Sequence, residues 1–292
     1  MKTTKKLITL LIALSLLSST VLYGACSNDE TLTLPPAQSE ESVPPPPAET
    51  PSLPPVSDDN ASVDKENDKN ETVVLPVQPV VEKAQYITCT GDSVNLRSGA
   101  GTSYAVVGSA KKGETYALVG KSGQWYKTYY RGKTVYLSAS YAAVLSVEKN
   151  EDTQVEKVIQ EGYKLLGVPY VYGAVRVHDG KGRLLSGFTT QKFDCSSLVQ
   201  YVFYKGADKL LDVNTRTQVK QGKFVAKKDL QRGDCMFFTN ESRQYLTGIE
   251  RVGHVAIYLG DNYILHTASD YARIEKMTAS RWKFYIESRR FI

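Results

Sequence analysis

Proline is confined almost entirely to one stretch of this 292-residue chain. Eleven of the twelve prolines lie between positions 35 and 79, and residues 27–85 contain no aromatic side chain. A segment of this composition cannot bury enough apolar surface to offset the entropy lost on folding, and clustered prolines stiffen it. We therefore predict a disordered, acidic tether over residues 26–85, with the folded part of the chain following it.

The segment before the tether has the pattern of an export signal. Three lysines in the first six residues precede an apolar run over residues 7–22, which is shorter than a typical membrane span. The run ends at Cys26 in the sequence LYGAC, which resembles a bacterial lipoprotein cleavage site, although Tyr23 departs from the usual small apolar residues. We expect a signal peptide over residues 1–25 and a lipid-anchored protein facing the cell wall. Ordinary secretion and an uncleaved anchor are the alternatives.

Charge is divided unevenly along the chain. Residues 27–85 hold 12 acids and 3 lysines, whereas the whole chain has a net charge of +5, so the part after the tether is strongly basic. A basic body suits an anionic cell wall or membrane surface. Nucleic acid is the competing partner for such a body, but the export signal argues against it, and we expect no nucleic-acid partner.

Residues 86–147 have the pattern of a small all-β barrel. Short candidate strands alternate with turn signals, and the strands expected are residues 94–97, 105–108, 115–119, 125–130 and 134–137. The segments VNLRSG, KGE and QWYK resemble a bacterial SH3-like domain, with Val135 in place of the glycine that usually precedes the last strand. The resemblance implies contact with the cell wall or a wall for a catalytic cleft. Plain scaffolding is the alternative.

A single cysteine stands at the expected start of a helix. Apolar residues follow Cys195 at helical spacing, so Asp194 is predicted to be the N-cap and Cys195 to lie in the first turn. The positive end of the helix dipole favours a thiolate there. Backbone N–H groups at a helix start can also stabilise a developing oxyanion.

Two histidines lie on an expected β-hairpin downstream. The strand beginning at His254 alternates in character, residues 260–262 form a turn, and the second strand carries His266. If Leu259 pairs with Tyr263, His254 lies diagonal to His266 at roughly 7–8 Å between backbones. A cysteine nucleophile needs a base, and the base needs a group that orients it. Cys195, His254 and His266 are the candidates for these three roles.

Four stretches occur in order over the last 140 or so residues: GVPYVYG from Gly167, DCS from Asp194, DLQRGD from Asp229, and GHVAIY from Gly253 followed by a second histidine. Together they resemble the NlpC-type cell-wall cysteine peptidases, a papain-like family that cuts peptidoglycan stem peptides. The resemblance implies an α+β catalytic domain over residues 148–292.

The resemblance also implies roles for residues around the cysteine. Tyr170 is expected to line the site, while Asp194 and Ser196 help to hold the substrate. Each has a structural alternative, because a tyrosine after proline can simply pack and an N-cap aspartate needs no substrate. Cys195 itself can be a buried structural thiol, and His254 a satisfied strand histidine.

The chain departs from the family pattern beside the cysteine. Ser197 and Ala174 stand where glycine is common, and the connection over residues 174–192 is longer and more polar than usual. A long loop inside a compact domain is often functional, so we expect it to wall or cover the cleft. A surface excursion is the alternative. His178, within the loop, is expected to be solvated.

The sequence predicts neither a disulfide between Cys89 and Cys235 nor a metal site. Cys89 and Cys235 lie in different predicted domains, so we expect two buried thiols and no disulfide between them. Cys195 with two histidines lacks the fourth ligand and the spacing of a zinc site, so we expect no metal. The proposed hydrolysis requires no organic cofactor.

The resemblance implies a peptidoglycan endopeptidase that cleaves stem peptides, with the bond between D-Glu and the third-position diamino acid favoured. An N-acetylmuramoyl-L-alanine amidase and a crossbridge-cleaving peptidase are alternatives on the same scaffold. A non-catalytic wall-binding lipoprotein is the alternative from another class.

Overall fold

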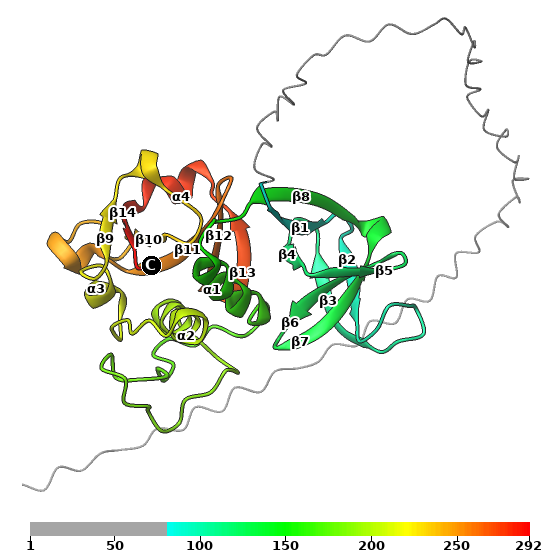
Figure 1. Ribbon diagram of the computed structural model, residues 1–292, viewed down its shortest axis with the longest axis horizontal. Coiled ribbons are helices and arrows are strands. Elements are labelled where there is room, and N and C mark those ends of the chain that lie inside the picture. The colour runs from blue at the N-terminus through cyan, green and yellow to red at the C-terminus, as the bar shows by residue number, and fades with distance from the viewer. Residues whose placement is uncertain (1–80) are drawn as a thin grey trace, which may run out of the picture. The chain divides into compact units, whose positions relative to one another are not determined.

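The computed structural model describes residues 81–292 (Figure 1). The predicted signal peptide, Cys26 and most of the predicted tether lie outside the described residues. The first strand, β1, begins at Lys83, so the last three residues assigned to the tether belong to a strand instead. Over residues 81–292, no helix is both long and apolar enough to cross a membrane.

Eight strands build the first half of the described chain. They form two antiparallel groups, in the orders β8-β1-β4 and β3-β2-β7-β6-β5. Their bounds are β1 Lys83–Cys89, β2 Ser93–Arg97, β3 Val106–Lys111, β4 Thr115–Leu118, β5 Gly120–Ser122, β6 Trp125–Tyr130, β7 Lys133–Ser138 and β8 Ala142–Glu148. The five predicted strands correspond to β2, β3, β4, β6 and β7. Three strands were not predicted from the sequence: β1 and β8, which pair with each other along their whole length, and the short β5.

The second half is an α+β unit. Helix α2 (Cys195–Ala207) packs on strands β11 and β12, and helix α1 (Thr153–Lys164) packs on α2. The apolar residues predicted for the buried face of α2, Leu198, Val199, Val202 and Phe203, are all buried. The remaining elements are α3 Thr215–Gln218, β9 Lys223–Val225, β10 Cys235–Phe238, β11 His254–Gly260, β12 Tyr263–Ala268, β13 Tyr271–Lys276, α4 Ala279–Lys283 and β14 Tyr285–Arg290.

One sheet runs through both halves. Strand β4 pairs with β13 between Thr115 and Ile274, which gives the order β8-β1-β4-β13-β12-β11-β10-β14-β9. The Tyr271 hydroxyl also donates a hydrogen bond to the Glu114 carboxylate across this junction. The sequence indicated two separate domains, whereas the structure joins the barrel strands to the edge of the catalytic sheet.

A buried ion-pair cluster centred on Arg232 also links the same two halves. Arg232 Nε lies 2.6 Å from Glu156 Oε1, and its Nη1 and Nη2 donate to the hydroxyls of Tyr86 and Tyr163 at 2.5 and 2.9 Å. Nη1 also donates to the Leu259 carbonyl at 2.8 Å. Arg232 therefore links β1, α1 and the histidine hairpin, which gives the DLQRGD stretch a structural purpose.

Within residues 81–292, the two thiols outside helix α2 are buried and unpaired. Cys89 is 2% exposed and Cys235 is fully buried, and both are free. The prediction of separate core thiols is confirmed. Their burial makes them poorly accessible to reagents in the folded protein.

Candidate active site

Cys195 is the first residue of α2, as predicted. The Asp194 side chain accepts a hydrogen bond from Ser197 N at 2.8 Å, and Ser197 Oγ accepts one from Asp194 N at 2.9 Å, which completes a capping box. Ser197, at the position where the family usually has glycine, thus stabilises the helix start. The thiol residue is only 9% exposed.

The histidine hairpin is close to the prediction. Ile257 pairs with Leu265, and carrying this register one residue further places Ala256 opposite His266, with His254 on the diagonal. The predicted pairing of Leu259 with Tyr263 is wrong, because Gly260 pairs with Tyr263 after a register shift. The connection is shorter than predicted: only Asp261 and Asn262 lie between the strands, and both have positive φ, as a type I′ turn requires.

The two imidazoles belong to a longer hydrogen-bonded chain. His254 Nε2 lies 2.9 Å from His266 Nδ1, and His266 Nε2 lies 3.0 Å from Glu275 Oε2. Arg281 Nη2 and Nε then donate to Glu275 Oε1 at 2.7 and 3.0 Å. Neither Glu275 nor Arg281 was predicted from the sequence.

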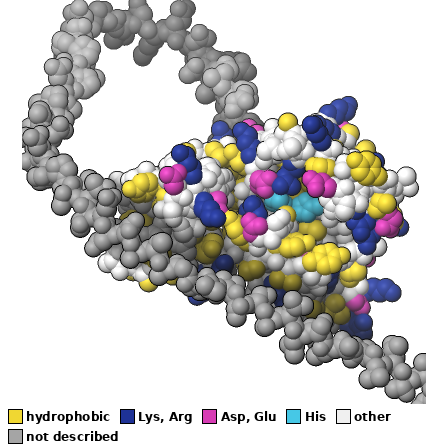
Figure 2. Space-filling view, turned by 180° about the vertical axis from the view of Figure 1, so that it is seen from behind, with side chains coloured by type: hydrophobic (Ala, Val, Ile, Leu, Met, Phe, Trp, Pro, Cys, Tyr) yellow, Lys and Arg dark blue, Asp and Glu magenta, His cyan; other side chains and the backbone are white. Residues whose placement is uncertain are grey.

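A cavity of about 570 Å³ brings the predicted nucleophile and base to one site. Cys195, His254 and Tyr170 line it, together with Phe238, Glu275 and Arg281. Of the three histidines in the chain, His178 and His266 are buried and only His254 is partly exposed. Histidine is visible on the face shown in Figure 2, in a hollow bordered by acidic and basic side chains.

The thiol is protonated in the resting site. Burial, and then the charge of Asp194, raise the pKa of Cys195 to about 12, although the backbone N–H groups of Val255 and Ser196 act in the opposite direction. The helix start acts in the predicted direction, because the Ser196 N–H lowers the pKa of Cys195, but it does not produce a thiolate at this site. Desolvation of the charged form outweighs the favourable dipole.

The histidines are held neutral. Burial lowers the pKa of His254 well below its usual value, and the nearby His266 and Arg281 lower it further. Burial also lowers the pKa of His266, against the opposing hydrogen bond to Glu275. Burial raises the pKa of Glu275, but the hydrogen bond from His266 and the contacts of Arg281 prevail and hold it at about 2. A neutral thiol and a neutral imidazole thus line the same cavity.

This protonation state makes a prediction about thiol reactivity. Because the thiolate is the reactive form and its pKa is raised to about 12, alkylation of Cys195 by iodoacetamide should keep accelerating above pH 9. The rate, followed by intact mass with Cys195→Ala as the blank, is the measurement. A rate that stays constant between about pH 5 and pH 8 would indicate a preformed thiolate–imidazolium pair and contradict this assignment.

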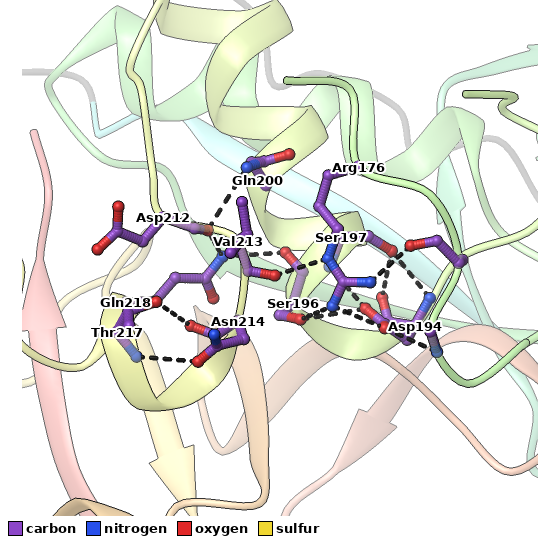
Figure 3. Close-up of polar contacts among 12 residues, drawn as sticks. Arg176, Asp194, Ser196, Ser197, Gln200, Asp212, Val213, Asn214, Thr217 and Gln218 are labelled. Atoms are coloured by element: carbon purple, nitrogen blue, oxygen red, sulfur yellow. Dashed lines mark hydrogen bonds and ion pairs between the residues drawn. The ribbon is translucent and has the colours of Figure 1, made fainter. Parts of the chain in front are cut away.

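Asp194 and Ser196, predicted to hold the substrate, are engaged by the protein itself (Figure 3). The Arg176 guanidinium points toward both, with Nη2 2.9 Å from Asp194 Oδ2 and 2.9 Å from Ser196 Oγ. Gly173 N also donates to Asp194 Oδ2 at 3.1 Å. Neither Asp194 nor Ser196 lines the cavity, so their role toward substrate stays a prediction.

The loop over residues 174–192 reaches the helix start and not the cavity. No residue of the loop lines the cavity, so the prediction that it walls the cleft is wrong there. Ala174 and Val177, near the start of the loop, are buried. His178 was predicted to be solvated, but its side chain is buried with its ring 5.1 Å from that of Tyr204.

His178 is held there by hydrogen bonds at both its backbone and its ring. Its carbonyl accepts from Gln200 Nε2 at 3.2 Å, and its Nδ1 accepts from Gly180 N at 3.0 Å.

Among residues 81–292, no group of three or more His, Cys, Asp or Glu side chains is placed to hold a metal ion.

Comparison with known proteins assigns both halves of the described chain. Residues 167–290 match the NlpC/P60 family, and residues 92–143 match the bacterial SH3 domain. The gamma-DL-glutamyl hydrolase of Bacillus subtilis is 32% identical over 152 residues, 52% of this chain and 32% of that protein. The peptidoglycan DL-endopeptidase CwlO of Bacillus licheniformis is 30% identical over 141 residues, 47% and 28% of the two chains.

A third curated relative and a solved structure also match. The gamma-D-glutamyl-L-lysine dipeptidyl-peptidase of Bacillus subtilis is 32% identical over 123 residues, 42% of this chain and 35% of that protein. A solved NlpC/P60 family protein from Bacillus cereus is 20% identical, with a TM-score of 0.38, over 71% of this chain and 63% of that one. The chain spans about a third of the length of the curated relatives it matches. The match to the NlpC/P60 family therefore covers residues 167–290, and the match to the bacterial SH3 domain covers residues 92–143 before it.

Proposed function

We propose that this chain is an exported cysteine endopeptidase that hydrolyses peptidoglycan stem peptides. The catalytic domain is proposed to extend over residues 148–292 and the SH3-like domain over residues 86–147. The observation that carries the proposal is the placement of Cys195 and His254 on one cavity, with His254 hydrogen-bonded to His266 inside an NlpC/P60 domain.

The proposed chemistry is acyl transfer through the thiol. Cys195 Sγ attacks the scissile carbonyl while His254 accepts the thiol proton, and His254 then gives that proton to the leaving amine. Water, deprotonated by His254, attacks the acyl-enzyme and releases the acid product and the free thiol. The neutral state of both groups means that the proton moves during the attack and not before it.

The favoured bond joins D-Glu to the third-position diamino acid. The names of three relatives support this choice, because they describe γ-glutamyl, D-glutamyl-L-lysine and DL-endopeptidase activities. The proposal includes Tyr170, Asp194 and Ser196 as residues that hold the substrate. Tyr170 has the firmest support of the three, because it lines the cavity.

Purified peptidoglycan tests the reaction class. Incubation with the protein should release soluble peptide fragments, whereas a non-catalytic wall-binding protein would sediment with the wall and release nothing. Titration with a thiol reagent under the same conditions separates an inert site from an inaccessible one. No release by protein whose Cys195 reacts stoichiometrically would sink the proposed hydrolase.

We also propose that Cys26 carries lipid and that the protein faces the cell wall from the membrane. The support is the sequence pattern of residues 1–26, since two or more acyl chains bind a membrane stably where one does not. Cys26→Ser should release the protein to the medium or leave it unprocessed. Fractionation of cells with an antibody measures this, and normal maturation with full membrane retention would count against the anchor.

A further inference from the structure

We propose that Glu275, held by Arg281, is a positioning residue that fixes the tautomers of both histidines and leaves Nδ1 of His254 free to accept the thiol proton. The inference rests on the proposed function, since it deepens the role of His254 as base. It extends the site beyond Cys195, His254 and His266.

The Glu275 carboxylate is fixed by Arg281 on one side and by His266 on the other. Arg281 directs two N–H groups at Glu275 Oε1, so this oxygen is occupied and the group is held as an anion. A carboxylate can only accept hydrogen bonds. The 3.0 Å contact of Oε2 with His266 Nε2 therefore requires the proton to lie on Nε2.

The consequence passes from one ring to the next. His266 is 1% exposed and neutral, so a proton on Nε2 leaves Nδ1 as an acceptor. The 2.9 Å contact between this atom and His254 Nε2 then requires His254 Nε2 to carry a proton. In a neutral ring that proton leaves Nδ1 bare, which is the state a general base needs.

The fold explains how Glu275 reaches this position. His266 on β12 pairs with Arg273 on β13, so Glu275, two residues further along, is the diagonal neighbour of His266 on the same face. Arg281 comes from α4, whose N-cap Thr278 accepts a hydrogen bond from Arg281 N at 3.2 Å. Two independent elements thus converge on the histidine pair.

The Glu275 carboxylate has a second effect when His254 becomes protonated. Proton transfer from Cys195 makes His254 an imidazolium, and a negative charge two hydrogen bonds away stabilises it. Arg281, which lines the same cavity, disfavours the positive charge on His254. The groups that face the histidines are Glu275, Arg281 and, toward His266, Arg273.

Glu275 also lines the cavity, so direct contact with substrate is the competing role. The test compares Glu275→Gln with Glu287→Gln, a control that neutralises a carboxylate paired with Arg289 on β14. Removal of the charge from a catalytic histidine's partner can cost on the order of 10⁴-fold in kcat. Glu275 acts one ring further away, so we expect a fall of about 10²-fold in kcat, KM within about threefold, and no change in the control.

Alkylation of Cys195 by iodoacetamide gives a readout that needs no peptide. The positioning role predicts a slower reaction and an altered pH profile in Glu275→Gln near neutral pH, with partial recovery in Glu275→Asp. A rise in KM with unchanged kcat and unchanged alkylation would overturn it in favour of substrate contact. If Glu275→Gln does not fold, Glu275→Asp, which keeps the charge but shortens the reach of the carboxylate toward His266, should lower kcat in the same direction. An unaltered kcat in that variant would also refute the proposal.

Failure of the positioning role of Glu275 and failure of the proposed function give different results. If the protein does not hydrolyse stem peptides, the alkylation profiles of the wild type and Glu275→Gln still differ. If hydrolysis occurs but the two alkylation profiles coincide, only the positioning role of Glu275 is wrong.

Discussion

Cys195→Ala is expected to abolish turnover while leaving the fold nearly intact. The thiol sulfur is the atom that forms the acyl-enzyme, and removal of a nucleophile of this kind lowers kcat by on the order of 10⁶-fold. Alanine fits the first turn of α2, and the capping box is formed by Asp194 and Ser197, so the helix start is retained. Rates of peptide release and a thermal unfolding curve measure the two effects.

Matched variants sharpen this result. Cys89→Ala removes a buried thiol from β1 and should keep kcat, since that residue does not line the cavity. His254→Ala should fall nearly as far as Cys195→Ala, whereas His266→Asn should lose less, because His266 only orients the base. A larger loss in His266→Asn than in His254→Ala would show that the two roles are exchanged.

Arg232→Ala is expected to cost about 3–5 kcal/mol of unfolding free energy. The substitution leaves Glu156 buried without its partner, and it removes the Arg232 N–H donors from the hydroxyls of Tyr86 and Tyr163, which keep only their mutual hydrogen bond at 2.7 Å. Because these groups join β1 to α1, the loss should affect both halves of the described chain together. Urea unfolding followed by fluorescence and by circular dichroism is the measurement.

A surface ion pair and a double substitution provide the controls. Arg289→Ala breaks the more exposed pair with Glu287 and should cost no more than about 1 kcal/mol. Arg232→Met combined with Glu156→Met should recover part of the loss, because no unpaired charge is then buried. A cost below about 1 kcal/mol for Arg232→Ala would mean that water enters and solvates Glu156.

Local rules predicted the part of the site that depends on one helix and one hairpin. The cap at Asp194 follows from side-chain chemistry at a helix start, and the diagonal of His254 and His266 follows from strand alternation. Both were readable because each involves residues close in sequence. The pairing near the turn was wrong because the shift before Gly260 is a backbone irregularity that alternation does not encode.

The rest depended on tertiary context. The same diagonal rule identifies Glu275, but only once β13 is known to lie beside β12, and no prediction covered that strand. The pKa of Cys195 is raised because the helix start is buried, and sequence gives the dipole but not the burial. His178 was expected to be solvated because its loop is polar, whereas contacts with Gln200 and Tyr204 hold it in the interior, and the contact of Arg176 with Asp194 was not predicted.

The most direct test of the central claim is mass spectrometry of the products from one defined muropeptide, a disaccharide tetrapeptide, treated with wild-type protein and with Cys195→Ala. The account predicts that the wild type yields a disaccharide carrying a dipeptide that ends in D-Glu, together with a free dipeptide that begins with the diamino acid, and that Cys195→Ala yields neither. Release of the whole tetrapeptide from the sugar would show an amidase, and equal cleavage by Cys195→Ala would contradict the thiol mechanism.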